Sequence, residues 1–225
     1  MPCHIFISGP IRPSELAVRK VILSIRAEFP DAITYLCTWT TSLDTSRIRS
    51  EVDHYLEIPE PDIRGQITVS TLTDDKPDCA VPGWPLRCYS MMYAVNALCA
   101  YAAPADDDII VRVRTDSIFR FTSAEHRSIV EKAKRGYLVW ECRMSGPRFN
   151  DWFGIATYAN FRKGWGFSTV EEYNLLLKDR WNTEDVIRVA LLRNGVEILP
   201  LDPSEMECFL LRQAPDGTLY EERGF

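Results

Sequence analysis

Two arginines and an aspartate alternate along one apolar segment near the middle of the chain. The segment runs from Asp106 to Phe119, and Arg112, Arg114 and Asp116 occupy every second position near its end. Its β-branched residues predict a strand buried inside a sheet, with these three side chains on one face. Because an unpaired buried charge costs several kcal/mol, we expect these groups to pair with one another, line a solvent-filled cleft or hold a ligand.

Asp116 lies where the predicted strand ends, and two interpretations of it stay open. Ligands of open α/β sheets bind at the carboxyl ends of strands, which makes Asp116 the first candidate for a ligand-binding residue. Alternatively, Arg114 and Asp116 are two residues apart on one face and form a purely structural ion pair. Perturbed charged groups at strand ends favour the functional interpretation.

A second acid stands beside two aromatic residues and a glycine, in the segment Asn150-Asp151-Trp152-Phe153-Gly154. Carbohydrate and ribose pockets use this combination, because an aromatic ring stacks on the apolar face of a sugar while a carboxylate binds its hydroxyls. An ordinary turn that leads into a strand uses the same residue types. Asp151 is therefore a candidate that the sequence leaves undecided between a pocket and a turn.

The elements that must position these groups begin with a strand, a helix and a second strand. Residues 4–7 predict the first strand, Ser14 opens a helix that Pro30 ends, and residues 33–39 predict the second strand. This order predicts an α/β fold whose mixed central sheet is flanked by helices. The turn after the first strand, at residues 8–12, lacks the glycine pattern of a dinucleotide fingerprint or a phosphate loop.

Further elements follow the same alternating pattern along the chain. Arg87 falls in the first turn of a helix predicted to end near residue 102, where an arginine opposes the helix dipole and is a candidate anion ligand. Ser168 begins a capping box, and Thr183-Glu184-Asp185 opens a later helix. Other segments predict strands near residues 55–58, 137–142, 196–199 and 208–211, a helix at 123–135 and an irregular stretch at 62–85.

The composition of the chain argues against several broad classes of protein. A chain of 225 residues fits one domain, and a net charge of −6 argues against a nucleic-acid binder. Seven scattered cysteines favour free thiols in the cytoplasm, and three histidines without a Cys-x-x-Cys pair argue against structural zinc. No segment has the length and apolarity of a membrane span, so membrane contact would be peripheral.

Three segments resemble those of the WavE-type lipopolysaccharide synthesis proteins, which are compact glycosyltransferases of the GT-A architecture. They are Ile7-Ser8-Gly9-Pro10-Ile11, the stretch from Glu28-Phe29-Pro30-Asp31-Ala32 to Cys37-Thr38-Trp39, and Arg112-Val113-Arg114-Thr115-Asp116. The Asp151-Trp152-Phe153 element extends the likeness. Two departures stand out: Arg87 is followed by Cys88 instead of the family's glutamine, and Asp116 stands without the second aspartate of a metal-binding Asp-x-Asp motif.

The resemblance implies a single GT-A-like domain over residues 1–225, with a nucleotide-sugar-binding half at 1–120 and an acceptor-side half at 121–225. Its expected activity is transfer of a sugar from a nucleotide-sugar donor to a glycan or lipid-linked glycan acceptor in polysaccharide biosynthesis. Two alternatives stay open, a sugar-nucleotide hydrolase or nucleotidyltransferase, and a non-catalytic GT-A-like binding protein.

The resemblance also implies roles for individual residues. Asp116 would hold the donor's diphosphate, with Mn²⁺ or Mg²⁺ or through arginines alone. Asp151 would be the base on the acceptor side, with Glu184 as the second candidate. The remaining donor-binding candidates are Ser8, Gly9, Pro10, Arg12, Arg87 and Arg114.

Overall fold

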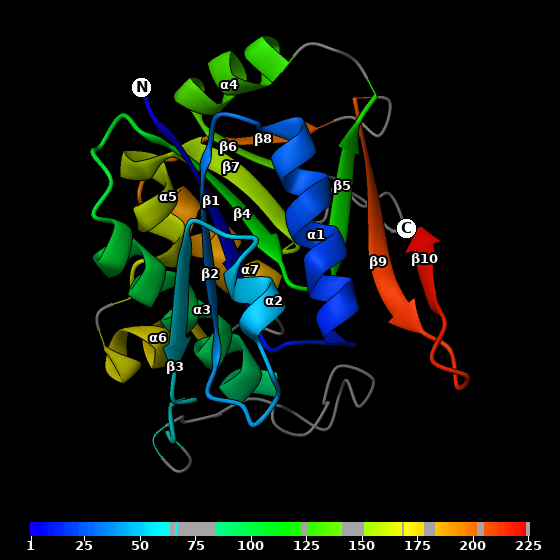
Figure 1. The fold of residues 1–225 in the computed structure, drawn as a ribbon. Helices are drawn as coiled ribbons and strands as arrows, with labels where there is room; N and C mark the ends of the chain where they lie inside the picture. Colours follow the sequence, from blue (N-terminus) through cyan, green and yellow to red (C-terminus); the bar gives the residue numbers. More distant parts are fainter. Residues whose placement is uncertain are drawn as a thin grey trace.

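A computed structural model describes residues 1–63, 66, 84–122, 126–140, 151–167, 169–177, 183–201 and 205–223. Within them, a seven-stranded sheet has the strand order β3-β2-β1-β4-β7-β6-β8, and a three-stranded sheet has the order β10-β9-β5 (Figure 1). Strands β1 (Cys3–Ser8), β2 (Ile33–Trp39), β3 (His54–Ile58) and β4 (Ile109–Arg114) are mutually parallel. The predicted mixed central sheet is confirmed.

The first helix shows why the predicted strand, helix and strand form as they do. Helix α1 (Glu15–Glu28) begins where the Ser14 hydroxyl accepts a hydrogen bond from the Ala17 amide at 3.3 Å, and its C-cap is Phe29, the residue before Pro30. Its apolar stripe is fully covered by the sheet and by β5 (Figure 1). The chain then returns as β2, which pairs with β1 in parallel.

The central segment, predicted as one strand that ends at Asp116, is divided between the two sheets. Strand β4 stops at Arg114, residues Thr115 and Asp116 form a turn, and β5 (Ser117–Phe121) belongs to the smaller sheet. There β5 pairs with β9 (Met206–Gln213), which in turn pairs with β10 (Leu219–Arg223). The chain therefore crosses from one sheet to the other at Asp116, because β5 pairs with β9, about ninety residues later in the sequence.

The remaining predicted elements are present with small shifts of their ends. They are α2 (Ser46–Arg49), α3 (Trp84–Ala102), α4 (His126–Arg135), β6 (Tyr137–Trp140), β7 (Phe153–Thr157), α6 (Val170–Leu177), α7 (Thr183–Arg193) and β8 (Ile198–Leu201). Ser168 lies outside the described residues, and the Thr169 hydroxyl accepts from the Glu172 amide at 3.2 Å. Most of the irregular stretch at 62–85 also lies outside them.

Two elements were absent from the sequence prediction, helix α5 (Tyr158–Trp165) and strand β10. Helix α5 follows β7 without a loop, and the Thr157 hydroxyl caps it by accepting from the Asn160 amide at 3.4 Å. A Cβ at Gly164 would stand 2.7 Å from the Leu191 side chain, so this glycine permits the close packing of α5 on α7. A segment of eight residues rich in aromatics gives little helical periodicity to detect.

Hydrophobic cores lie on both faces of the large sheet. One joins α1, α2 and α4 to the sheet and to β5 and β9, and the other joins α3, α5 and α7 to the opposite face (Figure 1). Arg112 shares the second face with Phe6, its register partner on β1. None of the described helices has both the length and the apolarity to cross a membrane. The described cysteines, Cys3, Cys37, Cys88, Cys99 and Cys208, form no disulfide with one another.

We expect Gly154→Ala to destabilise the protein through a clash in the second core. A Cβ at position 154 would overlap the Tyr137 hydroxyl, which accepts a hydrogen bond from Trp165 Nε1 at 2.9 Å. Overpacking of this kind costs about 2–3 kcal/mol, or roughly 5–10 °C in melting temperature for a chain of this length. Thermal denaturation measures it. The Tyr137 ring carbon Cζ would also overlap this Cβ, and Cε1 would lie 2.9 Å from it, so the background must remove the ring. In a Tyr137→Leu background, the same substitution should cost less; an equal cost in both backgrounds would contradict the clash.

Candidate functional site

A cavity of about 270 Å³ opens at the carboxyl ends of β1 and β4. Six of the predicted site residues line it: Ser8, Gly9, Pro10, Arg12, Arg114 and Asp151. Arg112, which the sequence placed on the same face as Arg114, lines it too, and the structure adds Trp39, Glu60, Ser90, Met91 and Thr115. Residues from six separate parts of the chain thus meet at the sheet edge where ligands of α/β folds bind.

The turn after β1 is fixed against the end of β4. The Gly9 amide donates to the Cys37 carbonyl at 3.2 Å, and the Thr115 hydroxyl donates to the Pro10 carbonyl at 2.7 Å. Gly9 has a φ of 135°, and a Cβ there would stand 3.1 Å from the Thr115 hydroxyl oxygen. Glycine is therefore required at this position by both backbone conformation and space. The result is a fixed rim on one side of the cavity.

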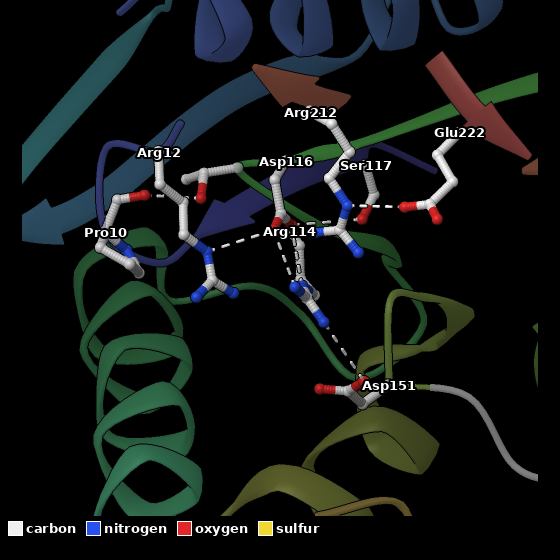
Figure 2. A network of polar contacts seen from close by, with 9 residues as sticks. Pro10, Arg12, Arg114, Asp116, Ser117, Asp151, Arg212 and Glu222 are labelled. Carbon is white, nitrogen blue, oxygen red and sulfur yellow. Dashed lines mark hydrogen bonds and ion pairs between the residues drawn. The ribbon is translucent and has the colours of Figure 1, made fainter. Parts of the chain in front are cut away.

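Asp116 is held between two arginines (Figure 2). Arg114 donates from Nε to Oδ1 at 2.9 Å and from Nη2 to Oδ2 at 2.8 Å, and Arg12 Nε lies 3.1 Å from Oδ2. Burial alone would raise the pKa of Asp116, but the charge and hydrogen bonds of Arg114, with the charges of Arg12 and Arg212, hold that pKa below its usual value. Asp116 is therefore an ionised partner that orients both arginines.

This geometry bears on the two interpretations of Asp116. The Arg114–Asp116 ion pair exists, and the same Arg114 lines the cavity. Asp116 itself lines a second, more open hollow of about 450 Å³, together with residues of β9 and β10. It thus lies behind the arginines, which are the groups that face the cavity.

Asp151 lies on the other side of Arg114 (Figure 2). Its Oδ1 is 3.8 Å from Arg114 Nη1, and the residue is 8% exposed. The neighbouring Trp152 ring lies under the Arg114 guanidinium at 5.7 Å. Asp151 directly precedes strand β7, as the turn interpretation expects, and it also lines the cavity. Its role in a carbohydrate or ribose pocket stays a prediction.

Arg112, which the sequence placed on the same face as Arg114, forms the cavity floor and is fully buried. Its guanidinium lies 4.7 Å from the centre of the Trp165 ring, on the unpredicted helix α5. Burial lowers the pKa of Arg112 to about 10, against the opposing charge of Asp151, so the side chain remains a cation at neutral pH.

The expected divalent metal does not fit the surroundings of Asp116. Both of its carboxylate oxygens already accept from or contact arginines, and the positive charges of Arg12 and Arg114 would repel a cation. Across the described ranges, no group of three or more His, Cys, Asp or Glu residues could hold a metal ion. The site instead concentrates donors suited to an anion.

Two predicted residues lie on described helices, but their side chains fall outside the described part of the structure. Arg87 is in the first turn of α3, and Glu184 is in the first turn of α7. Arg212 was missed altogether, although its charge acts on Asp116 and its Nε donates to Glu222 at 2.7 Å. Arg212 lies on β9, nearly a hundred residues after Asp116 in the sequence. No local sequence pattern indicates that the two residues lie close together.

Comparison with known proteins shows the fold. No family model and no curated protein sequence matches the chain. Among solved structures, the galactosyltransferase LgtC in complex with donor and acceptor sugar analogues has a TM-score of 0.50 and 11% identity, covering 89% of this chain and 73% of that one. The chain therefore has the GT-A architecture of nucleotide-diphospho-sugar transferases.

Two further similarities have lower scores. A glycosyltransferase involved in glycosylation of the major capsid of PBCV-1 has a TM-score of 0.46 at 11% identity, covering 90% of this chain and 82% of that one. The synthase of 4-diphosphocytidyl-2C-methyl-D-erythritol has a TM-score of 0.45 at 10% identity, covering 91% and 92%. At these scores neither similarity distinguishes one kind of transferase from another.

Proposed function

We propose that this protein is a glycosyltransferase that moves a sugar from a nucleotide-sugar donor to a glycan or glycoconjugate acceptor. The observation that carries the proposal is the cavity at the carboxyl ends of β1 and β4, which combines a fixed turn, inward arginines and a buried carboxylate in a GT-A fold. The resemblance to WavE-type proteins adds a finer prediction, that the acceptor is a lipid-linked glycan of lipopolysaccharide.

The donor's nucleotide would lie against the turn at residues 8–12, with its diphosphate on the arginines. Arg12 contacts Asp116 through Nε, and its half-exposed side chain points its terminal nitrogens away from Asp116 (Figure 2). Arg114 is oriented by Asp116 and lines the cavity. Fixed guanidinium groups of this kind bind phosphate oxygens and stabilise the charge that grows on a leaving diphosphate. Arg87 stays a prediction as a further ligand.

The acceptor would approach the donor beside Asp151. This carboxylate lies on the cavity wall opposite Asp116, with Arg114 between them (Figure 2). A base in that position would deprotonate the acceptor hydroxyl if the reaction inverts the sugar's configuration. Glu184 remains the second candidate for this role. Whether Mn²⁺ or Mg²⁺ takes part is also a prediction still to be tested, and the charges around Asp116 favour the arginine-based version.

One observation favours a second function, a non-catalytic binding protein. Asp116, the place of a GT-A metal ligand, is engaged by Arg114 and Arg12. A sugar-nucleotide hydrolase or nucleotidyltransferase would use the same cavity, and its products would distinguish it, because a hydrolase releases the free sugar without an acceptor.

Thermal unfolding with nucleotide diphosphates and nucleotide sugars tests the donor site. At a hundredfold excess over its dissociation constant, a ligand of the folded state adds about 2.7 kcal/mol, or roughly 5–10 °C for a chain of this length. We expect this shift for one base and the same shift in Mn²⁺ and in EDTA. A shift that EDTA abolishes would restore the metal, and no shift with any nucleotide would favour the non-catalytic binding protein.

A further inference from the structure

Arg112 is a buried cation that lacks a hydrogen-bond acceptor. Within the described part of the chain, none of its three guanidinium nitrogens has a hydrogen-bond partner, and its exposed fraction is 0%. Its guanidinium lies over the Trp165 ring, 4.7 Å from the ring centre, and this ring offers a flat surface but no acceptor atom. Buried guanidinium groups normally form several hydrogen bonds, so this one calls for an acceptor that the described residues do not supply.

The two nearest buried carboxylates, Asp116 and Asp151, contact other arginines. Asp116 accepts from Arg114 twice and contacts Arg12, and Asp151 lies nearest to Arg114 at 3.8 Å. The charge of Asp151 acts on Arg112 without a hydrogen bond between them. Of the three arginines that line this cavity, Arg112 is therefore the one without a hydrogen bond or ion pair to a carboxylate among the described residues. The other acid in the lining, Glu60, is exposed.

A second unpaired donor faces the same cavity. The Ser8 hydroxyl is buried, has no hydrogen-bond partner among the described residues, and lines the cavity. On the adjacent strands Ser8 is in register with Arg114, and Phe6 with Arg112, so Ser8, Arg112 and Arg114 project to one face of the sheet. An unpaired hydroxyl and an unpaired guanidinium on one face are complementary to the oxygen atoms of an anion.

We propose that Arg112 binds an oxyanion of the donor at the floor of the cavity, either a phosphate oxygen or a carboxylate carried by the sugar. This deepens the proposed function and rests on it. Arg112 would be the innermost ligand, and Trp165 would hold its guanidinium plane in position. The Tyr137 hydroxyl accepts from Trp165 Nε1 and so fixes that ring in turn.

Isothermal titration calorimetry of the wild type, Arg112→Met and Arg112→Lys tests the proposal. The probes are inorganic pyrophosphate, the nucleoside diphosphate that shifts the melting temperature most, and its glucose and glucuronate conjugates. Arg162→Met is the matched control, because Arg162 also stacks on an aromatic ring, at 5.7 Å from the Tyr158 centroid, and does not line the cavity. We expect Arg112→Met to weaken binding at least tenfold, Arg112→Lys to weaken it less, and the control to change nothing.

The pattern of losses identifies the source of the oxyanion. Weaker binding of pyrophosphate and of every nucleotide points to the phosphate, whereas a loss confined to the glucuronate conjugate points to a sugar carboxylate. Unchanged affinity of Arg112→Met for all probes would overturn the proposal. If the wild type binds pyrophosphate through Arg112 but no nucleotide, the proposed function fails and the oxyanion site stands; if it binds no probe, both fail.

A measurement on the wild type covers the case in which Arg112→Met does not fold. The Nε–H resonance of Arg112, assigned by its disappearance in Arg112→Lys, is followed by NMR during titration with the tightest probe. An oxyanion at the guanidinium should move this resonance more than that of Arg162. A resonance that stays in place at saturation would reject the proposal.

Discussion

Replacing Asp116 by asparagine is expected to destabilise the fold by about 3 kcal/mol and to lower sugar transfer at least a hundredfold. The substitution leaves the guanidinium of Arg114 without the carboxylate that holds two of its nitrogens, and it removes the contact with Arg12. Breaking one side of a buried ion pair has a cost of about this size. Misplacement of a binding group by about 1 Å is enough for a hundredfold loss of turnover.

The effect of Asp116→Asn on stability should depend on pH in a defined direction. Because the folded pKa of Asp116 lies below its usual value, its ion pairs stabilise the protein fully above about pH 4 and are lost as the pH falls through the folded pKa. Urea unfolding at about pH 7 and about pH 3 measures the difference between wild type and variant. That difference should shrink at the lower pH; an equal difference at both would mean that the carboxylate's charge is not what stabilises the fold.

Two further observations on Asp116→Asn separate its possible roles. Both arginines keep their charge, so affinity for a nucleoside diphosphate should fall less than turnover does. A metal bound by Asp116 would instead make the variant lose any response to Mn²⁺ that the wild type shows. Transfer within a few-fold of the wild type, in a folded variant, would remove Asp116 from the donor site. Asp106→Asn is a suitable control, since Asp106 is an exposed acid paired with Arg162 at 3.3 Å.

The alternation of residues 112–116 was enough to predict the face of the strand on which the arginines lie. It was not enough to predict which partners each arginine contacts. Side-chain alternation is a local property of a strand, and Arg112 and Arg114 do share a face. The end of the strand depends on β9, which pairs with β5 only when distant parts of the chain meet. The sequence therefore indicated Asp116 as the residue that faces the ligand site. In the structure, Arg12 and Arg114, which Asp116 contacts, line the cavity instead.

Trp165 also could not be placed in the site from the sequence. Helix α5 was not predicted, because eight residues that include a glycine and several aromatics give weak helical periodicity. Without α5 there is no ring beneath Arg112 and no reason to separate its role from that of Arg114. The turn at residues 8–12 was easier to place, since a strand followed by Ser-Gly-Pro predicts a loop at the carboxyl edge of the sheet.

Asparagine at position 151 is expected to lower kcat for sugar transfer by about 10²–10⁴-fold while leaving the KM for the donor near its wild-type value. Removal of a general base has an effect of this size, because the acceptor hydroxyl must then lose its proton to water. Steady-state kinetics in which donor and acceptor are each varied, at saturation of the other, measure kcat and the KM for the donor. Glu184→Gln is the companion variant and should retain turnover if Asp151 is the base.

The competing role for Asp151 is to position Arg114, whose Nη1 lies 3.8 Å from its Oδ1. In that case Asp151→Asn would raise the KM for the donor and weaken nucleotide binding, with a smaller change in kcat. The split between kcat and the KM for the donor therefore separates the two roles. Wild-type turnover in the variant would exclude both roles and make Glu184 the next residue to test as the base.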